Sequence, residues 1–144
     1  MVLSRRGETP QPEATDEMFA WYASLRSPGR AAVDAAVDKL HELGVGLGRP
    51  TADGVKASRL GVRELRAAET LRIFYKFDPR GVPILLTGGD KKGQDSDRWY
   101  RRMAKEADGL YDVHIAELQS EGALRAAAPP SPRQSRSQTA GMVR

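Results

Sequence analysis

The sequence VRELR at residues 62–66, followed closely by LRIFYKF at residues 71–77, sets the architecture that the rest of the chain must fit. In both stretches apolar and polar residues alternate along the chain, and both contain the β-branched and aromatic residues that are typical of strands. The connection at residues 67–70 is short, so we expect the two strands to pair in antiparallel orientation.

Pairing of Arg66 with Arg72 would sort the side chains of these strands onto opposite faces. One face is expected to pack beneath helices, because large apolar groups are costly to leave in water. Its members are Leu65, Ile73, Tyr75 and Phe77. The other face is expected to meet solvent, where its cations either hold an anion or are simply hydrated. Its members are Val62, Glu64, Arg66, Arg72, Phe74 and Lys76.

After these strands, the chain continues into a third strand and a final helix. Residues 78–81, DPRG, have proline and glycine where a type I turn prefers them, and residues 82–89, VPILLTGG, form an apolar run. Asp95 or Ser96 can cap the final helix, which Asp108–Gly109 can interrupt. The three strands therefore form a meander that leads into a C-terminal helix.

Two helices are predicted before the strands. Residues 16–26 carry one apolar stripe behind an N-cap at Thr15 or Asp16. Residues 27–43 carry a second stripe, which ends at Gly44. The predicted fold is α+β, with two N-terminal helices packed on a small antiparallel sheet of three to four strands and with a C-terminal helix.

The ends of the chain lack such periodicity. Residues 1–15 are polar and contain Pro10 and Pro12, so we expect a flexible N-terminal segment. Residues 120–144 are rich in alanine, proline, serine and arginine, which predicts a disordered basic tail. One domain is therefore expected at residues 16–119.

The composition excludes several classes of protein. Cysteine is absent, which excludes disulfides, cysteine nucleophiles and thiolate metal sites and fits a reducing cytoplasm. His41 and His114 lack the spacing of metal ligands, and we expect both to be structural or surface residues. No apolar run is long enough to span a membrane. The net charge of +4 and the pI near 9.6 favour a polyanionic partner.

A second group of cations lies next to aromatic residues. The glycine-flanked sequence GGDKKG supplies Lys91 and Lys92, and Trp99 and Tyr100 follow in the first turns of the last helix. Lysines hold phosphates and aromatic rings stack on unpaired bases, so this group suits a nucleic acid. Trp99 is nevertheless more typical of a core anchor than of a stacking platform.

Three stretches carry a family resemblance. They are LGRPTADGVKASRLGVRELR (47–66), LRIFYKFDPRGVPILLTGGDKKG (71–93) and WYRRMAKEADGLYDVHIAEL (99–118). In this order and spacing they resemble the RelE/HigB-type toxins of type II toxin-antitoxin systems, in the phage-derived, HigB-like branch of the RelE/ParE superfamily. The resemblance extends over about residues 16–119.

The resemblance implies a cytoplasmic endoribonuclease that needs no metal or other cofactor and cleaves messenger RNA at the ribosome. It also implies a helix-turn-helix antitoxin as the partner that keeps the toxin inactive. Carried over by position, the candidate catalytic residues are Arg66, Arg72, Lys91 and Tyr100. The candidate RNA-binding residues are Arg63, Lys76, Lys92 and Trp99.

The requirements of metal-free RNA cleavage suggest a hypothetical role for each of these residues. The 2′-hydroxyl attacks its own phosphate, so the site needs a base, an acid and a group that stabilises the phosphorane. Arg66 and Arg72 would clamp the phosphate. Lys91 would steer the RNA backbone and share the charge, while Tyr100 or Lys92 would handle a proton.

Two further expectations remain open at this point. The family begins with an extended strand, whereas apolar and polar residues do not alternate in the leading segment here. We therefore expect a stub at Val2–Leu3, an open sheet edge, or a chain whose assigned start is wrong. The function also has two alternatives. One is a ParE-like toxin that inhibits gyrase without nuclease activity, and the other is a noncatalytic member that binds only RNA or an antitoxin.

Overall fold

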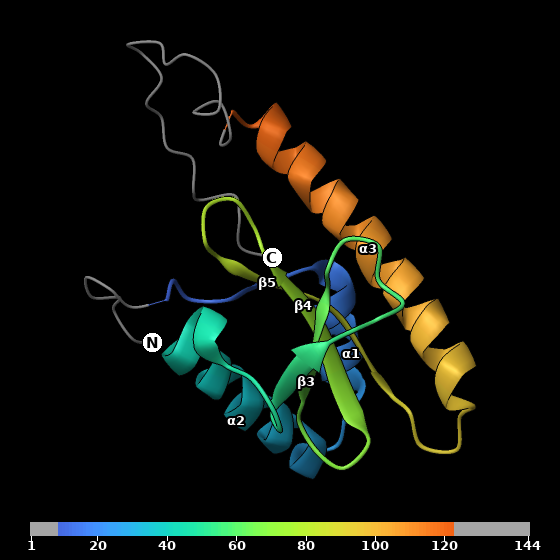
Figure 1. The fold of residues 1–144 in the computed structure, drawn as a ribbon. Helices are drawn as coiled ribbons and strands as arrows, with labels where there is room; N and C mark the ends of the chain where they lie inside the picture. The colour runs from blue at the N-terminus through green and yellow to red at the C-terminus, as the bar shows by residue number, and fades with distance from the viewer. Residues whose placement is uncertain (1–8, 123–144) are drawn as a thin grey trace.

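A computed structural model describes residues 9–122 of the chain, and helices cover both faces of its central sheet. The elements are β1 (Glu13–Ala14), α1 (Asp16–Ser24), α2 (Ser27–Leu43), η1 (Gly44–Gly46), β2 (Ala52–Gly54), β3 (Arg63–Arg66), β4 (Leu71–Phe77), β5 (Pro83–Asp90) and α3 (Ser96–Ser120). Helices α1 and α2 pack on one face and α3 runs across the other (Figure 1). The predicted α+β class is confirmed.

The sheet has five strands in the order β1-β5-β4-β3-β2. The predicted antiparallel meander of β3, β4 and β5 is confirmed, as is the register that places Arg66 opposite Arg72 and Leu65 opposite Ile73. The sheet differs from the prediction at its two edges. Strand β2 pairs antiparallel with β3, and β1 pairs parallel with β5, so the sheet is mixed rather than purely antiparallel.

The N-terminal edge strand lies just before α1. Glu13 and Ala14 pair with β5, and Thr15 extends the contact through its backbone N–H, 3.1 Å from the Leu85 carbonyl, and its hydroxyl, 2.7 Å from the Leu86 carbonyl. The expected flexible segment therefore ends in a short ordered strand. Pro12 precedes that strand and so interrupts no hydrogen bond within it. The expected stub at Val2–Leu3 lies outside the described residues.

The predicted starts of α1 and α3 are confirmed by side-chain caps. Thr15 Oγ1 accepts from the Met18 N–H at 3.0 Å, and Asp95 accepts from the Arg98 N–H at 3.1 Å. The predicted interruption at Asp108–Gly109 is wrong, because α3 continues through it. The Asp108 side chain is buried and bonds to a loop of the sheet, which holds this part of the helix in place.

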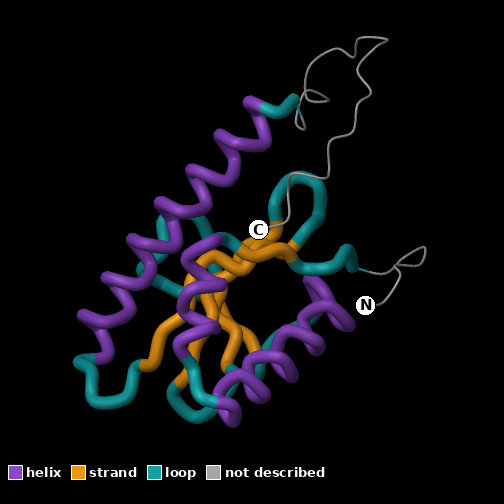
Figure 2. Tube along the Cα trace, turned by 180° about the vertical axis from the view of Figure 1, so that it is seen from behind, coloured by secondary structure: helices purple, strands orange, loops and turns teal. Residues whose placement is uncertain are grey.

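Helices lie on both sides of the sheet (Figure 2), and each face of the sheet carries its own hydrophobic core. The expected core face of Leu65, Ile73 and Tyr75 does pack beneath α1 and α2. The expectation that the other face meets solvent is wrong, since α3 covers its apolar members, Val62 and Phe74. The charged residues of that face therefore lie at the margin of the α3 contact.

The predicted basic tail falls almost wholly at residues 123–144, outside the described part. Among residues 9–122, no helix combines the length and the hydrophobicity that crossing a bilayer requires.

Candidate functional site

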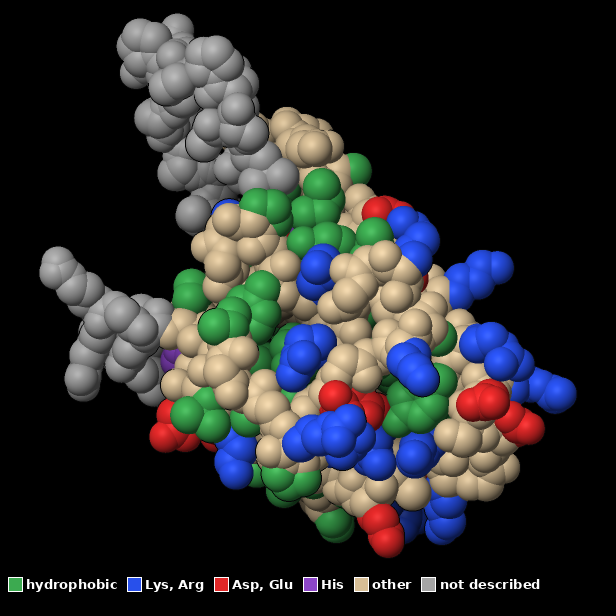
Figure 3. All heavy atoms as spheres, in the orientation of Figure 1, with side chains coloured by type: hydrophobic (Ala, Val, Ile, Leu, Met, Phe, Trp, Pro, Cys, Tyr) green, Lys and Arg blue, Asp and Glu red, His purple; other side chains and the backbone are tan. Residues whose placement is uncertain are grey.

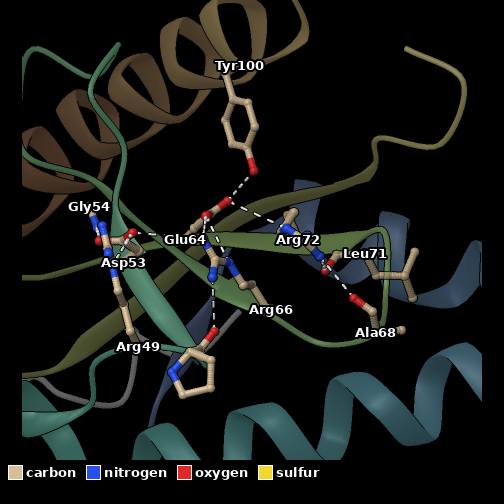
Figure 4. Close-up of polar contacts among 10 residues, drawn as sticks. Arg49, Asp53, Gly54, Glu64, Arg66, Ala68, Leu71, Arg72 and Tyr100 are labelled. Atoms are coloured by element: carbon tan, nitrogen blue, oxygen red, sulfur yellow. Dashed lines mark hydrogen bonds and ion pairs between the residues drawn. The ribbon is translucent and has the colours of Figure 1, made fainter. Parts of the chain in front are cut away.

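The Glu64 carboxylate of β3 is the centre of a polar cluster at this margin (Figure 4). The Tyr100 hydroxyl of α3 donates to Oε1 at 2.5 Å. Arg66 donates to Oε2 from Nε at 3.1 Å and from Nη2 at 2.9 Å. The Arg72 Nε of β4 lies 3.6 Å from Oε1. One buried carboxylate thus joins two strands to the helix that covers them.

The strand register explains why both arginines reach the same carboxylate. Arg66 and Arg72 are directly opposite each other, and Glu64 is two residues from Arg66 on the same face. Arg72 is buried, and its Nη1 donates to the carbonyls of Ala68 at 2.9 Å and Leu71 at 3.0 Å. The structure therefore places Arg72 behind the carboxylate, where it supplies positive charge from within the protein.

Arg66 occupies the outer side of the cluster. About a third of its side chain is exposed, and its guanidinium also donates to the Pro50 carbonyl at 3.2 Å and lies 3.8 Å from an Asp53 oxygen. Two carboxylates and a carbonyl hold the group in one orientation. An arginine held in this way is prepared to bind an anion without further ordering.

Tyr100 is half-buried and its ring is fixed by aromatic neighbours. The ring packs edge-on against Trp99 and Phe74, with centroid distances of 5.0 and 6.2 Å, and the Lys91 ammonium lies 5.6 Å from its centroid. Burial and the hydrogen bond to Glu64 raise the pKa of Tyr100, against the opposing effect of Arg72. The phenol therefore stays protonated at neutral pH.

A surface hollow of about 560 Å³ opens in front of this cluster. Its lining comes from the β2–β3 loop, β3, the end of β5 and the first turns of α3, and consists of Gly54, Val55, Lys56, Ala57, Glu64, Arg66, Lys91, Asp97, Tyr100 and Arg101. Lysine and arginine side chains gather over this part of the surface (Figure 3). The lining of the hollow is thus partly polar and partly apolar, and it contains more cations than carboxylates.

The structure brings three of the four predicted catalytic residues to the hollow. Arg66, Lys91 and Tyr100 line it, whereas Arg72 reaches it only through Glu64. The sequence predicted Glu64 only as a member of the outer face of the paired strands. The charge pattern identified it as an acidic neighbour but gave no sign that α3 would bring a phenol onto it.

The predicted RNA-binding residues do not line the hollow. Trp99 is buried in the core, so its indole is not available to stack on a base. Arg63 donates to the Tyr75 hydroxyl at 3.2 Å and to the Leu47 carbonyl at 3.1 Å, and Lys76 lies over the Tyr111 ring. Lys92 is exposed beyond the lining. Two cations of the lining, Lys56 and Arg101, were not predicted, because neither belongs to the paired strands or to the glycine-flanked lysine sequence that supplied the candidate cations.

A second buried polar cluster ties the far end of β4 to α3 and β1. The Asp78 carboxylate lies 2.9 Å from His114 Nε2 and 2.7 Å from Arg80 Nη2, and Arg80 also donates to Glu13 at 3.0 Å. Burial on its own raises the pKa of Asp78, but the hydrogen bonds from His114 and Arg80 lower it overall. His114 is therefore part of a structural network, as expected.

No group of three or more potential metal ligands occurs within residues 9–122. The polar groups of the hollow are mainly nitrogen cations, which suit an anion rather than a metal ion. The site can therefore bind a phosphate through arginine and lysine and can pass a proton between Tyr100 and Glu64.

Comparisons with known proteins agree with the sequence motifs. The profile of the family described as "Phage derived protein Gp49-like (DUF891)" matches residues 20–112. The chain is 42% identical over 104 residues to "Putative toxin HigB3" of Mycobacterium tuberculosis, which covers 71% of this chain and 90% of that protein. It is 33% identical over 109 residues to "Putative toxin HigB2" of the same organism, covering 72% of this chain and 54% of that protein. No solved structure matches significantly. The chain belongs to the phage-derived, Gp49-like protein family, the HigB-like group that its sequence motifs predict.

Proposed function

We propose that this chain is the toxin of a toxin–antitoxin pair and that it acts in the cytoplasm as an endoribonuclease on ribosome-bound messenger RNA. The family match and the names of the two HigB relatives support the first part. One observation carries the second part. A buried carboxylate, Glu64, binds both a phenol and an arginine at the wall of a cationic hollow.

The hollow suits a phosphodiester of single-stranded RNA. Two cations of the lining contact the Glu64–Tyr100 pair: Arg66 through its ion pair with Glu64, and Lys91 through its position over the Tyr100 ring. In the proposed complex these two groups bind the non-bridging oxygens of the scissile phosphate. They also stabilise the additional negative charge of the phosphorane, the role in which fixed cations contribute most.

The base would be Tyr100 acting together with Glu64. In the proposed reaction, the Tyr100 oxygen takes the proton of the RNA 2′-hydroxyl while its own proton passes along the 2.5 Å hydrogen bond to Glu64. The bond from the 2′-oxygen to phosphorus forms and the bond from phosphorus to the 5′-oxygen breaks. The products are a 2′,3′-cyclic phosphate and a free 5′-hydroxyl.

The acid would be Lys91. An arginine does not give up its proton under these conditions, whereas an ammonium can transfer one to the departing 5′-oxygen. Arg72 would remain behind Glu64 and keep the carboxylate in place. The mechanism therefore assigns four roles to groups of this chain and requires no bound metal.

The partner expected for such a toxin is a cognate antitoxin of the helix-turn-helix type. The names of the relatives support an antitoxin in general, and its helix-turn-helix character is part of this proposal. An antitoxin that covers the hollow or distorts the Glu64–Tyr100 contact would abolish cleavage.

The test is expression of the full chain without an antitoxin, with Tyr100→Phe and Arg66→Ala variants. Wild-type protein should arrest protein synthesis and leave messages with 5′-hydroxyl and 2′,3′-cyclic phosphate ends. Loss of the phenol should slow cleavage by about 10²–10⁴-fold, and loss of the guanidinium by about 10²–10³-fold. Arg26→Ala, an exposed arginine outside the hollow, is the matched control and should remain toxic.

Other outcomes identify the alternatives. Filamentation with DNA damage but intact messages would replace the nuclease by a gyrase inhibitor. RNA binding without cleavage by purified wild-type protein on translating ribosomes would indicate a noncatalytic member. Cleavage in vitro that disappears with a metal chelator would contradict the metal-free mechanism.

A further inference from the structure

The loop of residues 55–62 between β2 and β3 is fixed by more contacts than a simple connection needs. Its ends are joined by the Val55 N–H, 3.1 Å from the Val62 carbonyl. Ser58 Oγ accepts from the N–H groups of Leu60 at 3.2 Å and Val62 at 2.9 Å. The loop therefore has one well-defined conformation, with Lys56 on its outer side.

A buried carboxylate of α3 holds this loop against the helix. Asp108 is 5% exposed, and it accepts from the Ser58 hydroxyl at 2.6 Å and from the Arg59 N–H at 2.9 Å. The Arg59 side chain adds a surface ion pair with Asp112 at 2.6 Å. Burial of a carboxylate is unfavourable unless hydrogen bonds compensate for it, so this attachment is specific. It fixes Lys56 relative to α3, which carries Arg101.

Lys56 and Arg101 leave the hollow with unbalanced positive charge. The lining contains the cations Lys56, Arg66, Lys91 and Arg101 and the carboxylates Glu64 and Asp97. Glu64 already binds Arg66 and Tyr100. In the part of the chain that the structure describes, neither Lys56 nor Arg101 forms an ion pair or a side-chain hydrogen bond. Cations gathered around one hollow repel each other unless an anion binds among them.

Lys56 also connects this hollow to a second one, along which a bound RNA chain would continue. Lys56 lines both the hollow in front of Glu64 and a neighbouring hollow of about 530 Å³, in which the other cation, Arg49, is paired with Asp53 at 2.9 Å. The first hollow, at about 560 Å³, is larger than one phosphate group requires, and Val55 and Ala57 give it apolar surface. A second anionic group next to the first is therefore the ligand expected in this hollow.

We propose that Lys56 and Arg101 form a second phosphate-binding site, which holds the phosphate next to the scissile one in a single-stranded RNA. The proposal rests on the proposed function, because it takes RNA as the ligand. In this arrangement Arg66 and Lys91 act on the reacting phosphate, whereas Lys56 and Arg101 set the register of the strand. Their loss weakens binding of the strand and leaves the proton-transfer groups intact.

The experiment measures binding of a fluorescein-labelled single-stranded RNA of about eight nucleotides to the full chain across a series of salt concentrations. The RNA carries 2′-O-methyl groups, so it cannot be cleaved. Lys56→Ala and Arg101→Ala should each weaken binding by about 5–20-fold and should each lower the slope of log K against log salt by about 0.7. Lys56→Arg should restore binding.

Arg102→Ala is the matched control, because it removes the same charge from an exposed position of α3 that does not line the hollow. It should weaken binding by less than about 2-fold. If Lys56→Ala and Arg101→Ala bind RNA as well as Arg102→Ala does, the second phosphate site is wrong and the nuclease proposal stands. If wild-type protein itself does not bind the RNA but cleaves messages in cells, the second site is also wrong. If it neither binds nor cleaves RNA, the proposed function fails as well.

Discussion

Replacement of Glu64 by glutamine is expected to destabilise the fold, because it leaves Arg72 as a buried cation without a counter-ion. The Arg72 side chain is 9% exposed and the Glu64 side chain 5%, and Nε lies 3.6 Å from Oε1. The Ala68 and Leu71 carbonyls solvate the guanidinium but do not neutralise it. Glutamine preserves the shape of the side chain, so the loss is mainly electrostatic.

The expected loss in the free energy of unfolding follows from the distance between the two charges. Two unit charges about 4 Å apart attract each other by about 4 kcal/mol at an effective dielectric constant of about 20. Removal of one partner from a buried pair costs about 3–5 kcal/mol. Since Nε and Oε1 are 3.6 Å apart and the two carbonyls still solvate the Arg72 guanidinium, we expect the lower end, about 3 kcal/mol, for Glu64→Gln. Arg72→Met should cost about 1–2 kcal/mol, because Glu64 keeps its other two partners.

The assay is urea unfolding of the wild type, the two single variants and the double variant, followed by circular dichroism. The double variant should be no less stable than Glu64→Gln alone, which corresponds to a coupling energy of about 1–2 kcal/mol. The urea dependence of the free energy of unfolding should stay constant across the four proteins. Effects of Glu64→Gln and Arg72→Met that add within about 0.5 kcal/mol would refute the argument.

Two further predictions concern stability elsewhere in the fold. The folded-state pKa of Asp78 lies below the ordinary value of 3.8, so its stabilising contribution is present above that value and is lost as the pH falls through the lowered pKa. Thermal unfolding between about pH 6 and pH 2 should therefore show a weaker pH dependence in Asp78→Asn than in wild type, and an equal dependence would contradict the role of this carboxylate. Gly88→Ala should lower the free energy of unfolding by about 1–3 kcal/mol, since an added Cβ would lie 2.2 Å from the Trp21 ring. Gly54→Ala, whose Cβ meets nothing within 4 Å, is its control in urea unfolding and should cost less than about 1 kcal/mol.

The parts of the fold that could be predicted depend on local patterns. The period of two in residues 62–66 and 71–77, with a short connection, determines the pairing of Arg66 with Arg72. The cap at Thr15 needs only a side-chain oxygen next to the first helical turn. Such signals involve neighbouring residues, so the sequence alone contains them.

The features that were missed depend on contacts between distant segments. Strands β1 and β2 have two and three residues, too few for a periodic pattern, and each exists because a longer strand offers an edge. The coverage of Val62 and Phe74 by α3 follows from how the helix crosses the sheet, which no local pattern records. For the same reason the sequence identified Tyr100 as a candidate without its link to Glu64.

The contact between Glu64 and Tyr100 joins residues that are 36 positions apart, and α3 follows the entire sheet in the chain. During synthesis the strands therefore leave the ribosome before the helix that supplies the phenol. A partly synthesised chain has the carboxylate and both strand arginines but lacks the hydroxyl that completes the group. The Glu64–Tyr100 contact therefore cannot form before the first turns of α3 have been synthesised, so completion of this site is a late step in the formation of the fold.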